Sequence, residues 1–269
     1  MTHVLREIER VEDRVLGALR CFDSATGADI VAPLVLDARN GRARFVRNRS
    51  GVYVVAFWSD LADHEEAFHS PPDVPAVGSR ELIVTIADPS GRYLPRLARL
   101  ALPRDPDPDN AGQPDSLFRP AQVPMYPAAS ASTGANWAVL HVTVLEDGSG
   151  DALGGALLRV RRNGDIIARS LTDGRGQALL PIVGVPMLTF GEDDDAVVVD
   201  EISVTVEAVF DPDTGTRMSA AALASGARPP VPVVDPESLD EDDALPETAQ
   251  TLAVAARRSR SLTLMIDVA

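Results

Sequence analysis

Two distant stretches of this 269-residue chain place their turn residues in the same order and at the same spacing. A constant shift of 123 residues puts Gly27 on Gly150, Asn40-Gly41 on Asn163-Gly164, Gly51 on Gly174, and Asp88-Pro89 on Asp211-Pro212. Asn-Gly is a strong hairpin signal, because a type I′ turn needs a positive φ at both central residues. We therefore predict an internal duplication whose two copies are built around the same series of turns.

Short runs rich in β-branched residues lie between these turns, as in HVTV, ELIVTI and SLTLMIDV. In EISVTVEA, the residues Ile202, Val204 and Val206 alternate with polar ones, which is typical of a strand with one face in a core and the other in water. Sheets of this kind pack in pairs. The pattern predicts an all-β fold made of two tandem β-sandwich domains.

The duplication and the composition of the intervening residues define the predicted domains. A short amphipathic helix is expected over residues 1–14, the first sandwich over 15–103 and the second over 137–269. The stretch 104–136 between them is rich in proline and is predicted to be an extended, semi-rigid linker arm. Five apolar or aromatic residues in and next to this arm are candidate interaction residues: Leu117, Phe118, Met125, Tyr126 and Trp137.

The second copy carries an acidic insertion at about residues 213–257. Its prolines and acidic runs suit a surface excursion or a disordered loop. The carboxylates from Asp235 to Asp243 either face solvent or form ion pairs, with Arg257, Arg258 and Arg260 as partners within the domain or with a neighbouring subunit.

Charge and composition exclude several classes of function. The net charge of −15 disfavours binding to nucleic acid and to anionic membranes. All 25 basic residues are arginine, so no lysine is present for Schiff-base chemistry or a P-loop. The single cysteine, Cys21, is expected to be a small buried residue. The N-terminal residues lack an apolar run of secretory length, so we expect the protein to be cytoplasmic when made.

Candidate ligand sites are few. In SLTDGRGQALL, the loop Asp173–Gly176 has neither the lysine of a P-loop nor enough oxygen ligands for calcium, and we interpret it as a turn. His64 and His69 are five residues apart and are expected to be solvated, and His141 is expected to face water. A weak calcium candidate is the acidic cluster of Asp193, Asp194, Asp195 and Asp200, whose alternative is a solvated loop. No catalytic residue and no cofactor are predicted.

The run from Val142 to Ile182, VTVLEDGSGDALGGALLRVRRNGDIIARSLTDGRGQALLPI, resembles the carboxypeptidase-regulatory-like, or transthyretin-like, family. The matching features are the opening strand, the Gly turn before Ala152-Leu153-Gly154-Gly155-Ala156, and Thr172-Asp173 with Gly176 before another apolar strand. The resemblance implies a seven-stranded sandwich of structural or binding type, transthyretin-like or Ig-like, with no catalytic residues.

The runs SGRYLPRLARLALPRDPDP, LFRPAQVPMYP and GANWAVL are similar to proteins of phage-tail-like contractile injection system gene clusters. That resemblance implies a non-enzymatic structural or adaptor component, such as a cap, collar or baseplate-associated piece, with other protein subunits as partners and release in a particle. The alternative from the residues themselves is a stand-alone protein- or carbohydrate-binding β-sandwich module.

Overall fold

The computed structural model describes residues 15–66, 74–185, 189–190, 197–198 and 201–268. The helix expected at 1–14 lies outside the described residues. So do His69 and the candidate calcium ligands Asp193, Asp194, Asp195 and Asp200.

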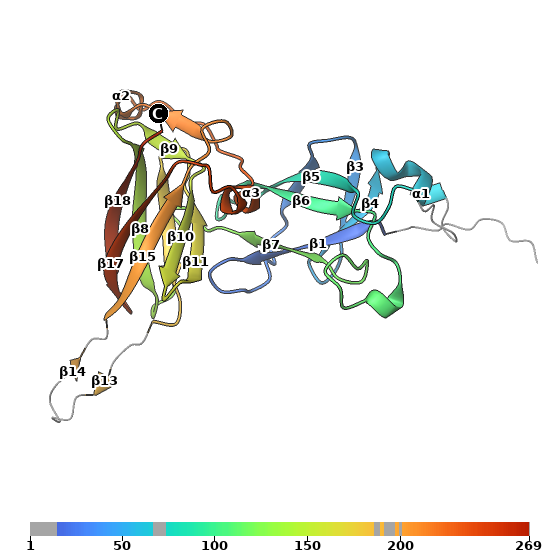
Figure 1. Ribbon diagram of the computed structural model, residues 1–269, viewed down its shortest axis with the longest axis horizontal. Helices are drawn as coiled ribbons and strands as arrows, with labels where there is room; N and C mark the ends of the chain where they lie inside the picture. Colours follow the sequence, from blue (N-terminus) through green and yellow to red (C-terminus); the bar gives the residue numbers. More distant parts are fainter. Residues whose placement is uncertain (1–14, 67–73, 186–188, 191–196, 199–200, 269) are drawn as a thin grey trace, which may run out of the picture. The chain divides into compact units, whose positions relative to one another are not determined.

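The fold is all-β, as predicted, with a few short helices (Figure 1). The strands are β1 (Gly17–Asp23), β2 (Val35–Ala38), β3 (Ala43–Arg47), β4 (Tyr53–Trp58), β5 (Arg80–Ala87), β6 (Arg96–Leu102), β7 (Ala121–Met125), β8 (Ala138–Glu146), β9 (Ala152–Gly154), β10 (Leu157–Arg162), β11 (Asp165–Leu171), β12 (Gln177–Ile182), β13 (Thr189–Phe190), β14 (Val197–Val198), β15 (Glu201–Val209), β16 (Thr216–Met218), β17 (Glu247–Ala255) and β18 (Ser259–Ile266). The helices are α1 (Ala62–Glu66), α2 (Ala220–Ala224) and α3 (Pro236–Glu241), with 3-10 turns η1 (Ser59–Leu61) and η2 (Pro108–Asn110).

Contacts divide the chain into two compact units, each assembled from separate segments. Unit 1 comprises Met1–Arg20, Asp37–Val84 and Arg99–Val123. Unit 2 comprises Cys21–Leu36, Thr85–Ala98 and Pro124–Ala269. The units are therefore discontinuous in sequence, whereas the predicted domains are consecutive stretches.

Unit 1 is organised around the central strand β4, which pairs antiparallel with both β1 and β3. Gly17 lies opposite Val55, and the side chains of Leu19 and Val55 are fully buried. Close contact explains the glycine, since a Cβ at Gly17 would lie 3.1 Å from Leu102. Tyr53 and Trp58 of β4 are buried as well, and burial of these apolar side chains stabilises the unit.

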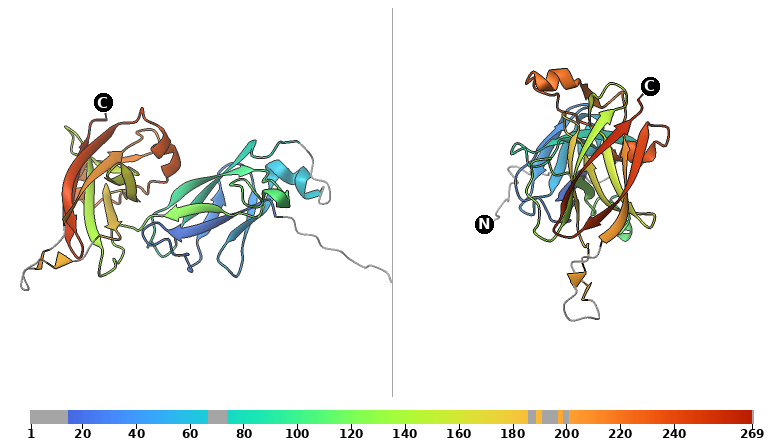
Figure 2. Two further views of the ribbon diagram at one scale, coloured as in Figure 1. Left: turned by 60° about the horizontal axis from the view of Figure 1, so that its bottom comes forward. Right: turned by 90° about the vertical axis from the view of Figure 1, so that its left-hand side faces the viewer.

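Unit 2 contains two larger sheets that enclose one hydrophobic core. One sheet has the strand order β11-β10-β15-β17, and the other has the order β12-β8-β9-β16 with β18 pairing in parallel to β8 (Figures 1 and 2). Alternate residues of β15 point into this core, namely Ile202, Val204, Val206 and Ala208. The alternation predicted for this strand is therefore confirmed, and the residues between them face outward or are half-buried.

The 123-residue shift relates strands as well as turns. It places β1 within β8, β2 within β10 and β3 within β11, and it makes β4 overlap β12 and β5 overlap β15. The pairings also correspond in part, because β4 pairs antiparallel with β1 as β12 does with β8. The copies differ at the third strand, since β3 pairs with β4 whereas β11 pairs with β10.

The two Asn-Gly turns do not have the same conformation. Asn163 and Gly164 have φ values of 54° and 92°, as a type I′ turn requires, and they join the paired strands β10 and β11. The prediction of a matching hairpin at Asn40-Gly41 is wrong, because β2 and β3 belong to different sheets. The Asn40 side chain instead accepts a hydrogen bond from the Ile83 amide and donates one to the Glu81 carbonyl.

The predicted equivalence of Gly51 and Gly174 is also wrong at the level of conformation. Gly51 has a φ of 84°, whereas the left-handed residue of the second turn is Gly176, with a φ of 69°. Gly174 is required for a different reason, because a Cβ there would lie 1.9 Å from the carbonyl oxygen of Pro230. One glycine permits a turn, and the other permits close packing of two backbones.

Strands form in both the predicted linker, 104–136, and the predicted insertion, at about 213–257, where no strand was predicted. Strand β7 lies within the predicted linker, where it neighbours β1 at the end of a sheet. An edge position tolerates Pro124, which has no amide hydrogen to donate. Strand β17 lies within the predicted insertion and pairs with β15 along its whole length. Its sequence, ETAQTLAVA, has three alanines and only three β-branched residues, so it gives a weak strand signal.

Candidate binding site

The residues that follow α2, from 226 to 246, are referred to below as the insertion segment. Of the two alternatives, a surface excursion or a disordered loop, the disordered loop is wrong, because the segment packs on the rest of unit 2. Val234 and Leu239 are buried in a cluster with Leu157 and Leu171, and the Val234 carbonyl accepts a hydrogen bond from the Leu97 amide. The segment thus covers the outward face of β10, which has a buried residue on both sides of the sheet.

Helix α3 lies in the second half of this segment, and local sequence signals fix its first residue. Asp235 is the N-cap residue and accepts a hydrogen bond from the Glu237 amide, and Pro236 occupies the first helical position. Glu237 pairs with Arg96, a side chain that is 1% exposed and also donates to the Pro124 carbonyl.

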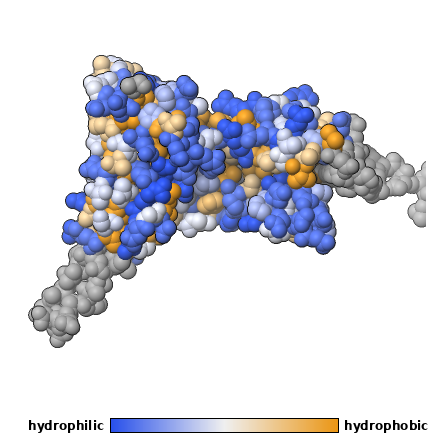
Figure 3. Space-filling model, in the orientation of Figure 1, coloured by the Kyte–Doolittle hydropathy of each residue, from blue (hydrophilic) through white to orange (hydrophobic). Residues whose placement is uncertain are grey.

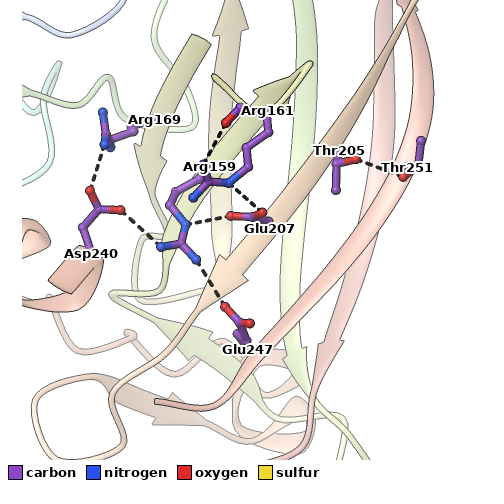
Figure 4. A network of polar contacts seen from close by, with 9 residues as sticks. Arg159, Arg161, Arg169, Thr205, Glu207, Asp240, Glu247 and Thr251 are labelled. Atoms are coloured by element: carbon purple, nitrogen blue, oxygen red, sulfur yellow. Dashed lines mark hydrogen bonds and ion pairs between the residues drawn. The ribbon is translucent and has the colours of Figure 1, made fainter. Parts of the chain in front are cut away.

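Arg159 on β10 lies at the centre of a polar network on this outward face (Figure 4). Its guanidinium lies 2.9 Å from Glu207, and 3.2 Å from both Asp240 of α3 and Glu247 of β17. Arg161 bonds to the other oxygen of Glu207 at 2.8 Å. One largely buried cation therefore holds three parts of the chain together, and its charge is compensated by carboxylates.

The acidic run of the insertion thus forms ion pairs within the chain, but among the described residues none of these pairs involves Arg257, Arg258 or Arg260. Asp240 contacts Arg159 and Arg169, whereas Glu241, Asp242 and Asp243 are exposed. Arg257 donates to the Asn136 side chain and Arg260 to the Ala253 carbonyl. The partners differ because α3 lies against β10 and β11, a contact that spacing along the chain does not reveal.

The Asp173–Gly176 loop has the geometry of a self-contained turn. One oxygen of the Asp173 carboxylate accepts hydrogen bonds from the amides of Arg175 and Gln177, at 2.8 and 3.0 Å. The Asp173 carbonyl accepts from the Gly176 amide. The carboxylate is thereby used to close the loop, as in an Asx turn.

The predicted exposure is confirmed for His141 and Cys21 but not for His64. His141 is exposed, as predicted, but His64 is 3% exposed, so the prediction that it is solvated is wrong. Cys21 is buried, as expected, and burial raises the pKa of its thiol to about 12. Within the described residues, no group of three or more His, Cys, Asp or Glu side chains is placed to hold a metal ion.

The five candidate interaction residues fall into two groups. Met125 and Tyr126 are buried, and Tyr126 belongs to the cluster under the insertion segment. Phe118 is 58% exposed, while Leu117 and Trp137 are half-buried. On the face drawn in Figure 3, hydrophobic residues are interspersed among hydrophilic ones. Only the second group offers surface to a partner.

Trp137 lines a cavity of about 400 Å³ in unit 2. The walls come from four separate parts of the sequence, at residues 23–32, 88–93, 127–137 and 179–181. This volume lies in the range of pockets that hold small ligands or single side chains. Apolar wall residues include Ile30, Leu179 and Pro181, which are buried.

The polar side of the cavity is anionic. The Tyr93 hydroxyl donates to one oxygen of Asp23 at 2.8 Å, and the amides of Ala25 and Thr26 donate to the other. Burial, followed by this bond to Asp23, raises the pKa of Tyr93 to about 12, so the hydroxyl remains a donor at neutral pH.

Asp88 is held as a carboxylate by its own turn. Partial burial by itself would raise the pKa of Asp88. Hydrogen bonds from the Ser90 side chain and from the Ser90, Tyr93 and Arg92 amides have the larger effect together, and the pKa of Asp88 is lowered. The turn begins at the Asp88-Pro89 pair that the sequence comparison singled out. The two carboxylates are thus prearranged by loop backbone rather than by basic side chains.

The orientation of Trp137 is fixed by its own loop. A Cβ at Gly134 would lie 2.6 Å from the indole ring, so only glycine allows the chain to pass so closely over it. The indole Nε1 has no hydrogen-bond partner among the described residues. The sequence indicated Trp137 and the Asp88 turn separately, but not that they share one cavity.

No protein-family model matches the chain, and no curated protein matches it either. Among the described residues, no helix has both the length and the apolar character needed to cross a membrane.

Proposed function

We propose that this chain is a non-enzymatic structural or adaptor component of a phage-tail-like contractile injection particle, placed as a cap, collar or baseplate-associated piece. In this proposal it consists of two tandem β-sandwiches, and its partners are other protein subunits of a symmetric assembly. It is made in the cytoplasm and is carried in the released particle.

The Arg159 network is the observation that carries the structural role. Arg159 of β10 contacts three carboxylates from separate elements: Glu207 of β15, Asp240 of α3 and Glu247 of β17. Charged side chains that bind each other in this way fix the shape of the surface around them. A component that must present a constant surface to neighbouring subunits needs this property.

The tandem architecture is supported by the strands that overlap under the 123-residue shift and by the core between the two sheets of unit 2. The particle itself is supported by the resemblance of the SGRYLPRLARLALPRDPDP, LFRPAQVPMYP and GANWAVL runs.

Electron microscopy of particles from cells that express the chain with a small affinity tag tests the proposal. We expect label bound to the tag at one fixed position along the particle axis. Unlabelled particles, combined with tagged protein that remains monomeric in the lysate, would reject it.

The second candidate function is a stand-alone binding module for a protein or carbohydrate ligand. The cavity beside Trp137 favours it, because an aromatic ring with polar groups on one side and apolar walls on the other is a common ligand environment. Binding of purified protein to immobilised glycans or proteins, in the absence of any particle, would distinguish it from the first.

A further inference from the structure

We propose that the cavity beside Trp137 receives an arginine side chain of a partner protein. The inference rests on the proposed function, in which the chain works by contacting other protein subunits. It adds the chemistry by which one such contact is recognised.

The charge of the cavity favours a cation. The charged side chains that line it are Asp23, Asp29, Asp88 and Arg92, of which Asp23 and Asp88 carry the negative charge that favours a cation. Among the described residues, no basic side chain forms an ion pair with Asp23 or Asp88. Asp23 is only 8% exposed, so its charge is weakly screened by water and acts at short range on whatever enters the cavity.

The hydrogen bonds of the cavity favour a cation over a neutral polyol. The oxygens of Asp23 and Asp88 already accept bonds from the hydroxyls and amides of their own loops. Few lone pairs of these oxygens can therefore accept a well-aligned hydrogen bond from the hydroxyl groups of a sugar. The negative charge persists, however, and attracts a cation without requiring a vacant lone pair.

The remaining walls suit the other parts of an arginine side chain. Val31, which is exposed, offers apolar surface to its three methylene groups. The indole of Trp137 is the best aromatic partner for a guanidinium, which stacks on ring faces. A chain with a net charge of −15 would also draw a basic partner surface toward this site.

The test uses the full chain and the indole NMR signals of its two tryptophans, Trp58 and Trp137. The Trp137 signal is assigned from the Trp137→Phe variant, and the probe is the tripeptide N-acetyl-Gly-Arg-Gly-amide. We expect a saturable shift of the Trp137 signal, with the buried Trp58 signal unchanged. The analogue with citrulline in place of arginine has the same shape without the charge, and we expect it to bind at least about tenfold more weakly.

A matched pair of variants checks the role of the charge. Asp29 and Asp109 are both exposed, but only Asp29 lines the cavity. We expect Asp29→Asn to weaken tripeptide binding at least about threefold and Asp109→Asn to leave it unchanged. Because both positions are exposed, neither substitution should prevent folding.

Several results would overturn the inference. One is a Trp137 signal that does not shift up to about 20 mM tripeptide. Others are a citrulline analogue that binds as tightly as the tripeptide, and Asp29→Asn and Asp109→Asn variants that change binding equally. A further one is a larger shift of the Trp137 signal with a neutral oligosaccharide than with the tripeptide. The last would favour the carbohydrate-binding module. Failure here leaves particle association untouched, because association is measured by microscopy of the particle and not by tripeptide binding.

Discussion

The guanidinium of Arg159 lies 2.9 Å from the carboxylate of Glu207, and the two residues are direct cross-strand partners in the β10–β15 pair. The side chain of Arg159 is 10% exposed and that of Glu207 is 19% exposed. A charge pair so far from solvent is stabilised by further partners, and here Asp240 contacts Arg159 and Arg161 contacts Glu207.

Replacing this arginine should therefore destabilise the protein. We expect Arg159→Met to lower the free energy of unfolding by about 2 kcal/mol, below the 3–5 kcal/mol typical of fully buried pairs because Asp240 and Glu247 remain partly hydrated. Urea denaturation measures the change. The control is Arg162→Met at the exposed end of β10, expected to stay within about 0.5 kcal/mol of the wild type. Equal effects of the two substitutions would show that the network does not hold the insertion segment.

The backbone contact between Gly174 and Pro230 should be sensitive to a single methyl group. A Cβ at Gly174 would lie 1.9 Å from the Pro230 carbonyl oxygen, so Gly174→Ala must push the insertion segment away. We expect a loss of about 1–3 kcal/mol in unfolding free energy, measured by urea denaturation. Gly112 has open space around its Cβ position, and Gly112→Ala is the neutral control. A Gly174→Ala variant as stable as the control would contradict the packing described.

Asp88 should make stability depend on acid pH. Its folded pKa is lower than the unfolded value of 3.8, so its contribution is present above 3.8 and is lost as the pH falls through the folded pKa. The wild type should therefore be more stable than Asp88→Asn at neutral pH, with the difference narrowing in acid. Urea unfolding of both proteins across this range provides the measurement, and a constant difference would be the contrary result.

Cys21 should be unreactive in the folded protein. The thiol is buried, and a pKa of about 12 leaves almost no thiolate at pH 8. We expect a disulfide reagent such as DTNB to label it only after unfolding in guanidinium chloride. Rapid stoichiometric labelling of native protein would mean that β1 opens easily.

The strands were predictable where one face is buried and the other is wet. Ile202, Val204 and Val206 alternate with polar residues because β15 has this environment, and the alternation can be read directly. The Asn163-Gly164 turn was predictable because its backbone conformation restricts the residues allowed. The same dipeptide at Asn40-Gly41 gave a wrong prediction. There the Asn40 side chain accepts a hydrogen bond from the Ile83 amide of β5, which no neighbouring residue in the sequence indicates.

The candidate site was predictable only in pieces. Trp137 and the Asp88 turn stood out in the sequence, but Tyr93 and Asp23 gave no signal of a shared cavity. Contacts between residues 70 positions apart, such as Tyr93 with Asp23, depend on how the loops converge. The buried state of His64 was missed for the same reason, because a histidine beside acidic residues in a short helix resembles a solvated one.

The central claim is that the chain is a fixed subunit of a larger particle. Quantitative mass spectrometry across a density gradient of particles from the native host tests it most directly. The account predicts a constant ratio of this chain to the tube and sheath subunits in every particle fraction, unchanged after a high-salt wash. A chain found only at the top of the gradient, where free proteins remain, would contradict it.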